Sequence, residues 1–248
     1  EKDFNKTTDK GIFMQELLLK PDDYVGVSFW IISAAMTAAT FFFFMERDRA
    51  EGKWKTSLSV AALVTGIAAI HYFYMRGVWV STGDSPTVYR YVDWLLTVPL
   101  QIVEFYLILA AITVVRAALF WKLLIASIVM LVFGYFGEVG AMSVWPAFAI
   151  GMAGWLYIIY EIWAGEAKEK VGEASEGTQF AFKAMAVILT VGWAIYPLGF
   201  VLGNGASDSA VNNLNILYNI ADVVNKTAFG MMVWYAATMD SKSNASEE

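Results

Sequence analysis

The residue in this sequence best suited to chemistry is a lysine inside an apolar segment. Lys226 lies in the middle of the stretch 215–239, and Asp222 precedes it by one helical turn. An ammonium group at mid-bilayer depth costs roughly 2.5–3.5 kcal/mol, so a chain seldom carries one without a partner or a use. The amine of lysine condenses with carbonyl compounds, and burial favours the neutral, reactive amine. Lys226 therefore indicates a site for a carbonyl cofactor.

A second set of polar residues lies on one face of another apolar segment: Arg90, Asp93, Thr97, Gln101 and Glu104. At about 100° per residue, Asp93 and Glu104 lie within roughly 20° of the same face, about 16.5 Å apart along a helix. Since the fourth and sixth apolar segments lack such groups, we expect this stripe to face the interior of a helix bundle. Carboxylates placed there mark proton or ion paths more often than structural positions.

Each of these residues also has a structural interpretation. Arg90 lies near a helix end, where arginine commonly extends toward the membrane surface. Glu104 fits a neutral, hydrogen-bonded packing residue, and Asp222 with Lys226 fits a buried ion pair that contributes little net stability. The structural interpretation leaves the coincidence of two carboxylates on one helix and a Lys–Asp pair on another unexplained.

Aromatic residues at mid-span depth indicate a ligand pocket between the helices: Trp94, Trp155, Trp193 and Tyr196. Pro197 is expected to kink the sixth helix beside them. Aromatic residues alone are weak evidence, because Trp and Tyr also form belts at the membrane surface.

The composition predicts a membrane protein that crosses the bilayer several times. The 248 residues are 58% hydrophobic and 16% charged, with a mean hydropathy of +0.53, whereas a soluble domain carries about 25% charged residues. The net charge of −6 argues against binding to nucleic acid. No cysteine and one histidine exclude thiolate and multi-histidine metal sites, and we expect no metal.

Hydropathy predicts an all-α bundle of seven transmembrane helices, each near the length of about 20 residues that crosses a bilayer. The spans are Tyr24–Met45, Lys55–Met75, Val88–Ile112, Ala118–Gly137, Val144–Ala164, Thr178–Gly203 and Asn212–Met239. Residues 24–239 thus form one domain, and the polar tails 1–23 and 240–248 are expected to be loosely ordered. The start lacks both an initiator Met and a signal peptide, which suggests prior processing or trimming. Residues 78–88 alternate around Gly83-Asp84 and predict a short extracellular β-hairpin.

The basic residues between the spans predict the orientation. One side holds Arg47, Arg49, Lys53, Lys55, Arg116, Lys122, Lys168, Lys170, Lys183 and Lys242, and the other holds Arg76. The first side is therefore expected to be cytoplasmic and the amino terminus outside. The four lysines of 1–23 oppose this assignment, but neighbouring acidic residues dilute them.

Three segments together resemble the microbial rhodopsins, and most closely the blue-absorbing proteorhodopsins: 90–100 (RYVDWLLTVPL), 193–197 (WAIYP) and 222–226 (DVVNK). The resemblance spans nearly all seven helices. It implies all-trans-retinal bound to Lys226 through a protonated Schiff base. It also implies that Asp93 is the primary counterion and proton acceptor, Asp222 the second counterion, and Glu104 the proton donor on the cytoplasmic side.

The resemblance also assigns the residues around the retinal. These are Trp94, Thr97, Gln101, Met130, Trp155, Trp193, Tyr196 and Pro197. Glutamine at the place of Gln101 is similar to the blue-absorbing group, because a polar side chain there favours the ground-state charge near the Schiff base. The alternative is that Gln101 merely joins the polar network of Thr97.

His71 is implied to hydrogen-bond to Asp93, although a lone histidine on an apolar face is more commonly a core residue. Related proteins form rings, so a contact from His71 to Trp30 of a neighbouring copy is implied. The expected assembly is a homo-oligomeric ring of five or six subunits.

The function implied is a light-driven outward proton pump in the bacterial inner membrane. Light isomerises the retinal, and a proton moves to Asp93, which Arg90 and His71 poise. Glu104, protonated at rest because burial favours a neutral carboxyl, then restores the proton. Asp93 must be ionised at rest, and its titration would belong to the whole cluster.

Four other functions remain as alternatives. A sensory photoreceptor signalling to a membrane partner is the nearest, but such relatives usually lack a carboxyl group at the place of Glu104. An anion pump would replace Asp93, and a sodium pump would carry Asn there. A transporter or receptor without retinal would use Lys226 and Asp222 to bind its substrate. The group releasing protons outside is not identified: Glu138 is a candidate, against the alternative of a solvated surface residue.

Overall fold

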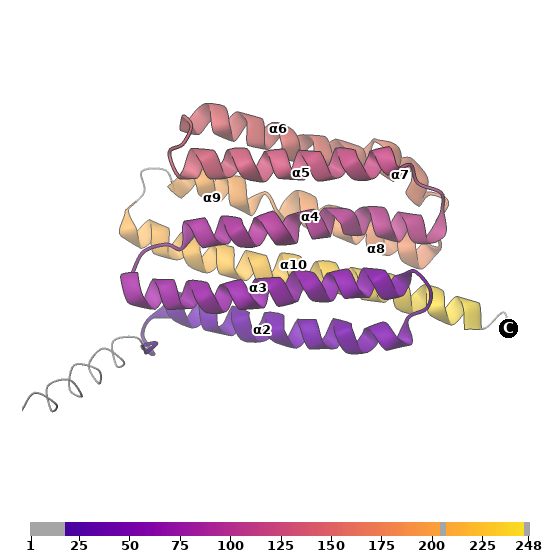
Figure 1. Cartoon of the computed structure of the whole chain (residues 1–248), viewed down its shortest axis with the longest axis horizontal. Helices are drawn as coiled ribbons and strands as arrows, with labels where there is room; N and C mark the ends of the chain where they lie inside the picture. Colours follow the sequence, from indigo (N-terminus) through magenta and orange to yellow (C-terminus); the bar gives the residue numbers. More distant parts are fainter. Residues whose placement is uncertain (1–17, 204–206, 246–248) are drawn as a thin grey trace, which may run out of the picture.

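The computed structural model describes residues 18–203 and 207–245, which form a bundle of long helices lying side by side (Figure 1). The long helices are α2 (Tyr24–Glu46), α3 (Trp54–Thr82), α4 (Thr87–Ile112), α5 (Ala117–Glu138), α6 (Val144–Trp163), α8 (Glu176–Val187), α9 (Ile195–Gly203) and α10 (Asp208–Ala245). Two short helices, η1 (Arg47–Arg49) and α7 (Glu166–Val171), lie in connections. Residues 1–17, 204–206 and 246–248 are outside the described residues, so the expectation of a loosely ordered amino-terminal tail at 1–23 falls mostly outside them.

Six stretches of the described helices are long and apolar enough to cross a membrane, and α10 supplies the seventh. The sixth of these stretches consists of α8, the π-helix η2 (Ile188–Gly192) and α9, which follow one another as one span. The part of α10 that packs into the bundle contains several asparagines, Asp222 and Lys226, which lower its hydropathy. The predicted all-α bundle is therefore confirmed. α10 continues to Ala245, beyond the Met239 at which the predicted seventh span ends.

The predicted β-hairpin at 78–88 is wrong. Residues 78–82 continue α3, and the hydroxyls of Ser81 and Thr82 bond back to the carbonyl of Val78 at 3.0 and 2.8 Å. Gly83 ends the helix with a φ of +73°, and its N–H bonds to the carbonyl of Trp79. Glycine with positive φ is favoured both at the end of a helix and in a hairpin turn, so the sequence alone does not separate the two. Within residues 18–203 and 207–245 there is no strand.

α10 packs against α2, α3, α4, α8 and α9, and in Figure 1 it lies behind α3 and α4. The π-helix η2 and a turn interrupt the sixth span directly before Pro197, which lies in the first turn of α9. Proline at such a position loses no helical hydrogen bond. The kink predicted at Pro197 stays a prediction; the structure shows an interruption directly before this residue, a π-helix followed by a turn.

Candidate functional site

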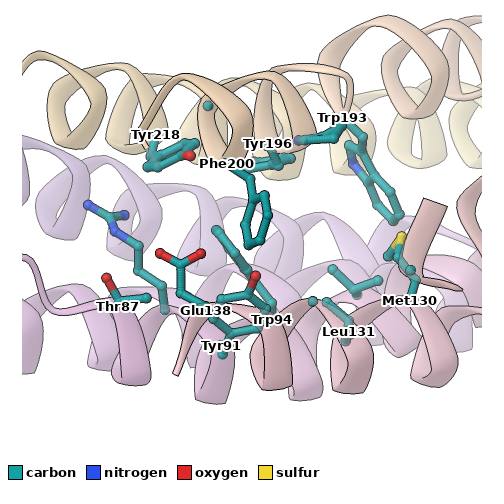
Figure 2. A pocket seen from close by; sticks show the side chains of 18 of the residues that line it. Thr87, Tyr91, Trp94, Met130, Leu131, Glu138, Trp193, Tyr196, Phe200 and Tyr218 are labelled. Atoms are coloured by element: carbon teal, nitrogen blue, oxygen red, sulfur yellow. The ribbon is translucent and has the colours of Figure 1, made fainter. Parts of the chain in front are cut away.

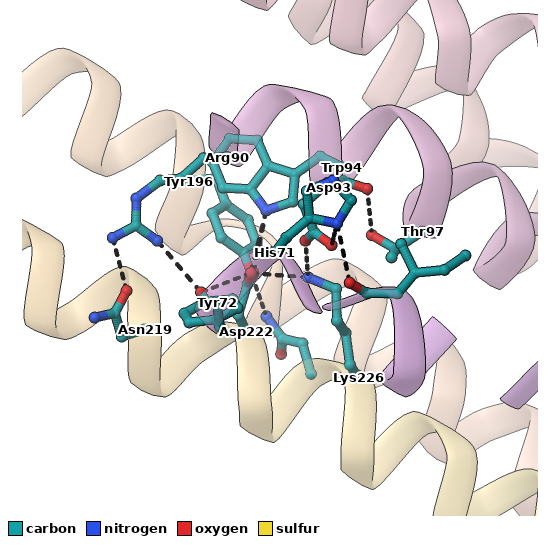
Figure 3. A network of polar contacts seen from close by, with 12 residues as sticks. His71, Tyr72, Arg90, Asp93, Trp94, Thr97, Tyr196, Asn219, Asp222 and Lys226 are labelled. Carbon is teal, nitrogen blue, oxygen red and sulfur yellow. Dashed lines mark hydrogen bonds and ion pairs between the residues drawn. The ribbon is translucent and has the colours of Figure 1, made fainter. Parts of the chain in front are cut away.

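The centre of the site is the amine of Lys226 between two carboxylates. Its Nζ lies 2.9 Å from Oδ2 of Asp93 on α4 and 2.8 Å from Oδ2 of Asp222, one turn earlier on α10 (Figure 3). The Lys226 side chain is 3% exposed, and both carboxylates are buried. The sequence placed these groups on two helices, and the structure brings them into one ion cluster.

Asp222 is held by hydrogen-bond donors from three other helices. The hydroxyl of Tyr196 donates to Oδ1 at 2.5 Å, and the hydroxyl of Tyr72 donates to Oδ2 at 2.8 Å. The indole N–H of Trp94 lies 3.3 Å from each oxygen. Hydrogen bonds to a carboxylate stabilise its charged form, so Asp222 is built to stay an anion.

Asp93 has a different environment from Asp222. Its Oδ1 has no hydrogen-bond partner among the residues that the structure describes. His71 Nδ1 lies 3.6 Å from this oxygen but 2.9 Å from the carbonyl of Ile67. The expected pair of His71 and Asp93 is therefore close in space without a direct hydrogen bond. Thr97 bonds to the backbone carbonyl of Asp93 at 3.0 Å.

Arg90 is buried but does not form an ion pair with Asp93. Its guanidinium donates to the side-chain oxygens of Asn219 at 2.6 Å and Asn215 at 3.0 Å, and to the Tyr72 hydroxyl at 3.3 Å. With Lys226 it supplies two positive charges, which Asp93 and Asp222 balance. Such balance is needed, because an unpaired buried charge is strongly destabilising.

Glu104 lies further along α4 than Asp93, toward the carboxyl end of this helix, and is 1% exposed. Neither of its oxygens has a hydrogen-bond partner in the described part of the chain, and the nearby Ser57 hydroxyl has none either. A small cavity of about 10 Å³ separates Glu104 from Lys226, with Gln101 and Phe229 among its walls. An ionised carboxylate in such surroundings is costly, so the geometry favours a protonated Glu104.

A cavity of about 380 Å³ leads from Lys226 between α4, α5, α6, α9 and α10. The predicted pocket residues that line it are Trp94, Gln101, Met130, Trp155, Trp193, Tyr196 and Pro197. Figure 2 shows Trp193 and Met130 facing each other across one end. Thr97, the remaining predicted contact, is buried and does not line the cavity.

The other end of the cavity reaches the predicted extracellular ends of the helices. Glu138, the last residue of α5, points into it near Tyr91 (Figure 2). Thr87 at the start of α4 also lines this part. The cavity connects Glu138 to the ion cluster, but Glu138 is also exposed to solvent, so the alternative of a solvated surface residue stays open.

Sequence reasoning missed four polar neighbours of the cluster: Tyr72, Asn215, Asn219 and Asn225. The asparagines 215 and 219 share a helical face with Asp222 and Lys226, since these residues follow one another at intervals of three or four. That spacing could have identified them. Tyr72 carried no comparable signal, because it adjoins His71 in an apolar helix. In the residues that the structure covers, no group of acidic and histidine side chains has metal-site geometry.

The comparisons with known proteins match the whole bundle. The family model of bacteriorhodopsin-like proteins matches residues 23–239. The chain is 59% identical over 229 residues to the green-light absorbing proteorhodopsin of Gamma-proteobacterium EBAC31A08, covering 92% of this chain and 91% of that protein.

Two solved structures are also similar. The blue light-absorbing proteorhodopsin from Med12 is 53% identical with a TM-score of 0.75, covering 88% of this chain and 99% of that one. Xanthorhodopsin, a light-driven ion pump with a dual chromophore, is 28% identical with a TM-score of 0.82, covering 92% and 98%.

Proposed function

Because the chain belongs to the family of bacteriorhodopsin-like proteins, we propose that it is a light-driven outward proton pump with retinal bound to Lys226. A membrane protein with retinal as its chromophore follows from the family itself. The identity of the transported ion, the attachment at Lys226 and the roles of the site residues are the proposal.

The residues around Lys226 fit retinal. The cavity beside its amine is lined largely by aromatic and aliphatic side chains, as an apolar polyene requires. The two carboxylates at 2.8 and 2.9 Å balance a positive charge on the nitrogen. Bound there as a protonated Schiff base, retinal supplies the absorption of light and the isomerisation that changes the direction and basicity of the nitrogen.

The observation that carries the proposal is that Asp222 accepts more hydrogen bonds from the protein than Asp93 does. Asp222 accepts from two tyrosine hydroxyls and an indole N–H, whereas Oδ1 of Asp93 has no hydrogen-bond partner in the described residues. An anion with fewer donors is the stronger base. Asp93 is therefore the carboxylate that takes the proton from the Lys226 nitrogen, and Asp222 remains charged.

Glu104 is suited to return a proton to the same nitrogen. It is buried further along α4 than Asp93, and the small cavity between Glu104 and Lys226 is about the size of one water molecule. Its lack of ion-pair partners within the described residues means that it holds a proton at rest. Acceptance at Asp93 and donation from Glu104 move one proton across the site.

The direction of transport follows from the orientation that the basic residues predict. Under that orientation, Glu104 is on the cytoplasmic side of Lys226, and Asp93 with Arg90 is on the outer side. Each outward proton then works against about 2.3 kcal/mol per 100 mV of membrane potential. The same orientation places the amino terminus outside the bacterial inner membrane.

Gln101 supports absorption of blue rather than green light. It is buried, lines the cavity, and its amide Nε2 has no partner among the described residues. A dipole free to interact with the chromophore stabilises the localised ground-state charge. The chain is 59% identical both to a green-light absorbing and to a blue-light absorbing proteorhodopsin, so overall identity does not decide the colour and the assignment rests on Gln101.

A ring of five or six copies is also part of the proposal. Trp30 and Phe73 form an edge-to-face pair 5.5 Å apart on the outer face of α2 and α3, and each is 45% exposed. An aromatic patch at this position suits contact with a neighbouring subunit, and the mass of the detergent-solubilised protein tests it.

Light-driven pH change tests the transport directly. Cells that express the chain with added all-trans-retinal should acidify an unbuffered medium under illumination, and a protonophore should abolish the change. Replacing sodium and chloride by potassium and sulfate should leave the signal intact. A sensory photoreceptor would give no pH change, and an inward pump would make the medium alkaline; either result would overturn the proposal.

A further inference from the structure

Asn225 is a buried polar residue that takes no part in the proposed proton transfer. It lies on α10 directly before Lys226 and is 4% exposed. Its amide Nδ2 donates to the hydroxyl oxygen of Tyr196 at 3.2 Å. That hydroxyl lies 2.5 Å from Oδ1 of Asp222 (Figure 3). Asn225 is thus connected to the ion cluster through one tyrosine.

Elementary hydrogen-bond rules fix the direction of this chain. A carboxylate can only accept, so the single hydroxyl proton of Tyr196 must point at Asp222. The tyrosine oxygen then faces Asn225 with its lone pairs, and the amide atom opposite must be the NH₂ group. A donor to a hydroxyl oxygen also strengthens the bond that this hydroxyl donates.

The backbone opposite Asn225 leaves space for this amide. Gly192, the last residue of the π-helix η2, lies against it. A Cβ at Gly192 would overlap Oδ1 of Asn225 and lie 2.9 Å from its Cγ. π-Helical turns occur frequently at functional sites. Here the widened turn brings a glycine to the place where any side chain would displace the amide.

We propose that Asn225 is a positioning residue of the ion cluster, which directs the Tyr196 hydroxyl toward Asp222, and that Gly192 holds Asn225 in place. This inference rests on the proposed function, since it concerns the charge that faces the Lys226 nitrogen. Without Asn225, Tyr196 donates more weakly to Asp222. More negative charge then remains on Asp222, and the ground state of the chromophore is stabilised.

The test is a double-mutant cycle between Asn225 and Tyr196. Asn225→Leu keeps the size of the side chain but removes its hydrogen bonds. It should shift the absorption maximum to shorter wavelength in the wild-type background. In the Tyr196→Phe background the same change should give no further shift, because the effect passes through the hydroxyl. Equal shifts in both backgrounds would overturn the proposal.

Gly192→Ala provides an independent arm, because it leaves Asn225 itself unchanged. It should shift the maximum in the same direction as Asn225→Leu. Gly77→Ala is the matched control, since a Cβ on that helical glycine of α3 meets no atom within 4 Å. A Gly192→Ala variant with the wild-type maximum would refute the role of Gly192.

A third readout does not depend on the chromophore. The infrared C–O band of Tyr196, identified by its loss in Tyr196→Phe, should move in retinal-free Asn225→Leu protein, or in Asn225→Ser if the leucine variant does not fold. An unmoved band would overturn the inference while leaving the proposed function intact. Wild-type protein that stays colourless with retinal would instead refute the proposed function.

Discussion

Replacing Asp93 by Asn removes one of the two charges that hold the Lys226 nitrogen in its positive form. The separation of 2.9 Å corresponds to about 6 kcal/mol of attraction at an effective dielectric constant of about 20. Broken buried ion pairs cost about 3–5 kcal/mol in practice. Since each 1.4 kcal/mol or so is a factor of ten, the nitrogen should hold its proton about two to four powers of ten less tightly.

A spectrophotometric titration of the retinal-bound protein measures this effect. The coloured form of Asp93→Asn should disappear at a pH about two to four units lower than in the wild type, following the same factor. At neutral pH the maximum should lie at longer wavelength, because Asp222 at 2.8 Å is then the sole carboxylate in contact with the nitrogen among the described residues. Light-driven acidification should be lost, because the acceptor is gone.

Asp84→Asn is the matched control, since Asp84 is an exposed residue in the connection between α3 and α4. It should match the wild type in titration, colour and transport. Should Asp93→Asn cells acidify the medium at the wild-type rate, Asp93 is not the acceptor. An unchanged titration would show that the ion pair does not stabilise the charged nitrogen.

Three further predictions address other parts of the molecule. Glu104→Gln should slow the return of the proton to the nitrogen, seen as a longer-lived deprotonated species in flash spectroscopy; an unaltered decay would remove Glu104 as donor. Gln101→Leu should move the absorption maximum to longer wavelength, and an unmoved maximum would show that this amide does not act on the chromophore. The Thr113 hydroxyl at 2.6 Å and then Lys170 at 3.1 Å lower the pKa of Glu173, outside the spans. Ionised Glu173 should therefore stabilise the folded protein fully above the ordinary glutamate pKa near 4.3. This contribution should be lost as the pH falls through the lowered pKa of the folded state. The thermal midpoints of Glu173→Gln and wild type should differ at pH 7 and converge in acid. A constant difference would contradict the assignment.

The bundle could be predicted from the sequence because each span is long and apolar, and because the positions of its few ionisable groups are restricted. Lys226 and Asp222 one turn apart, and Asp93 and Glu104 on one face, already required facing helices. The distances between Asp93 on α4 and Lys226 on α10 could not be predicted, because hydropathy shows which segments form helices but not how these helices pack. The structure adds that Lys226 lies between both aspartates.

Two features were beyond local sequence rules. Alternation around Gly83-Asp84 predicts a hairpin, but the same glycine closes a helix when the preceding hydroxyls bond to their own backbone. The difference between Asp93 and Asp222 depends on Tyr72 and Tyr196, which come from two other helices. Only the packed bundle shows which carboxylate has the donors.

The most direct test of the account is the site of covalent attachment. The protein is reconstituted with all-trans-retinal, reduced with borohydride in the light, digested and analysed by mass spectrometry. One retinyl-modified peptide is expected, with the modification on Lys226, and none in Lys226→Ala protein. An unmodified Lys226, or retinyl on another lysine, would contradict this attachment.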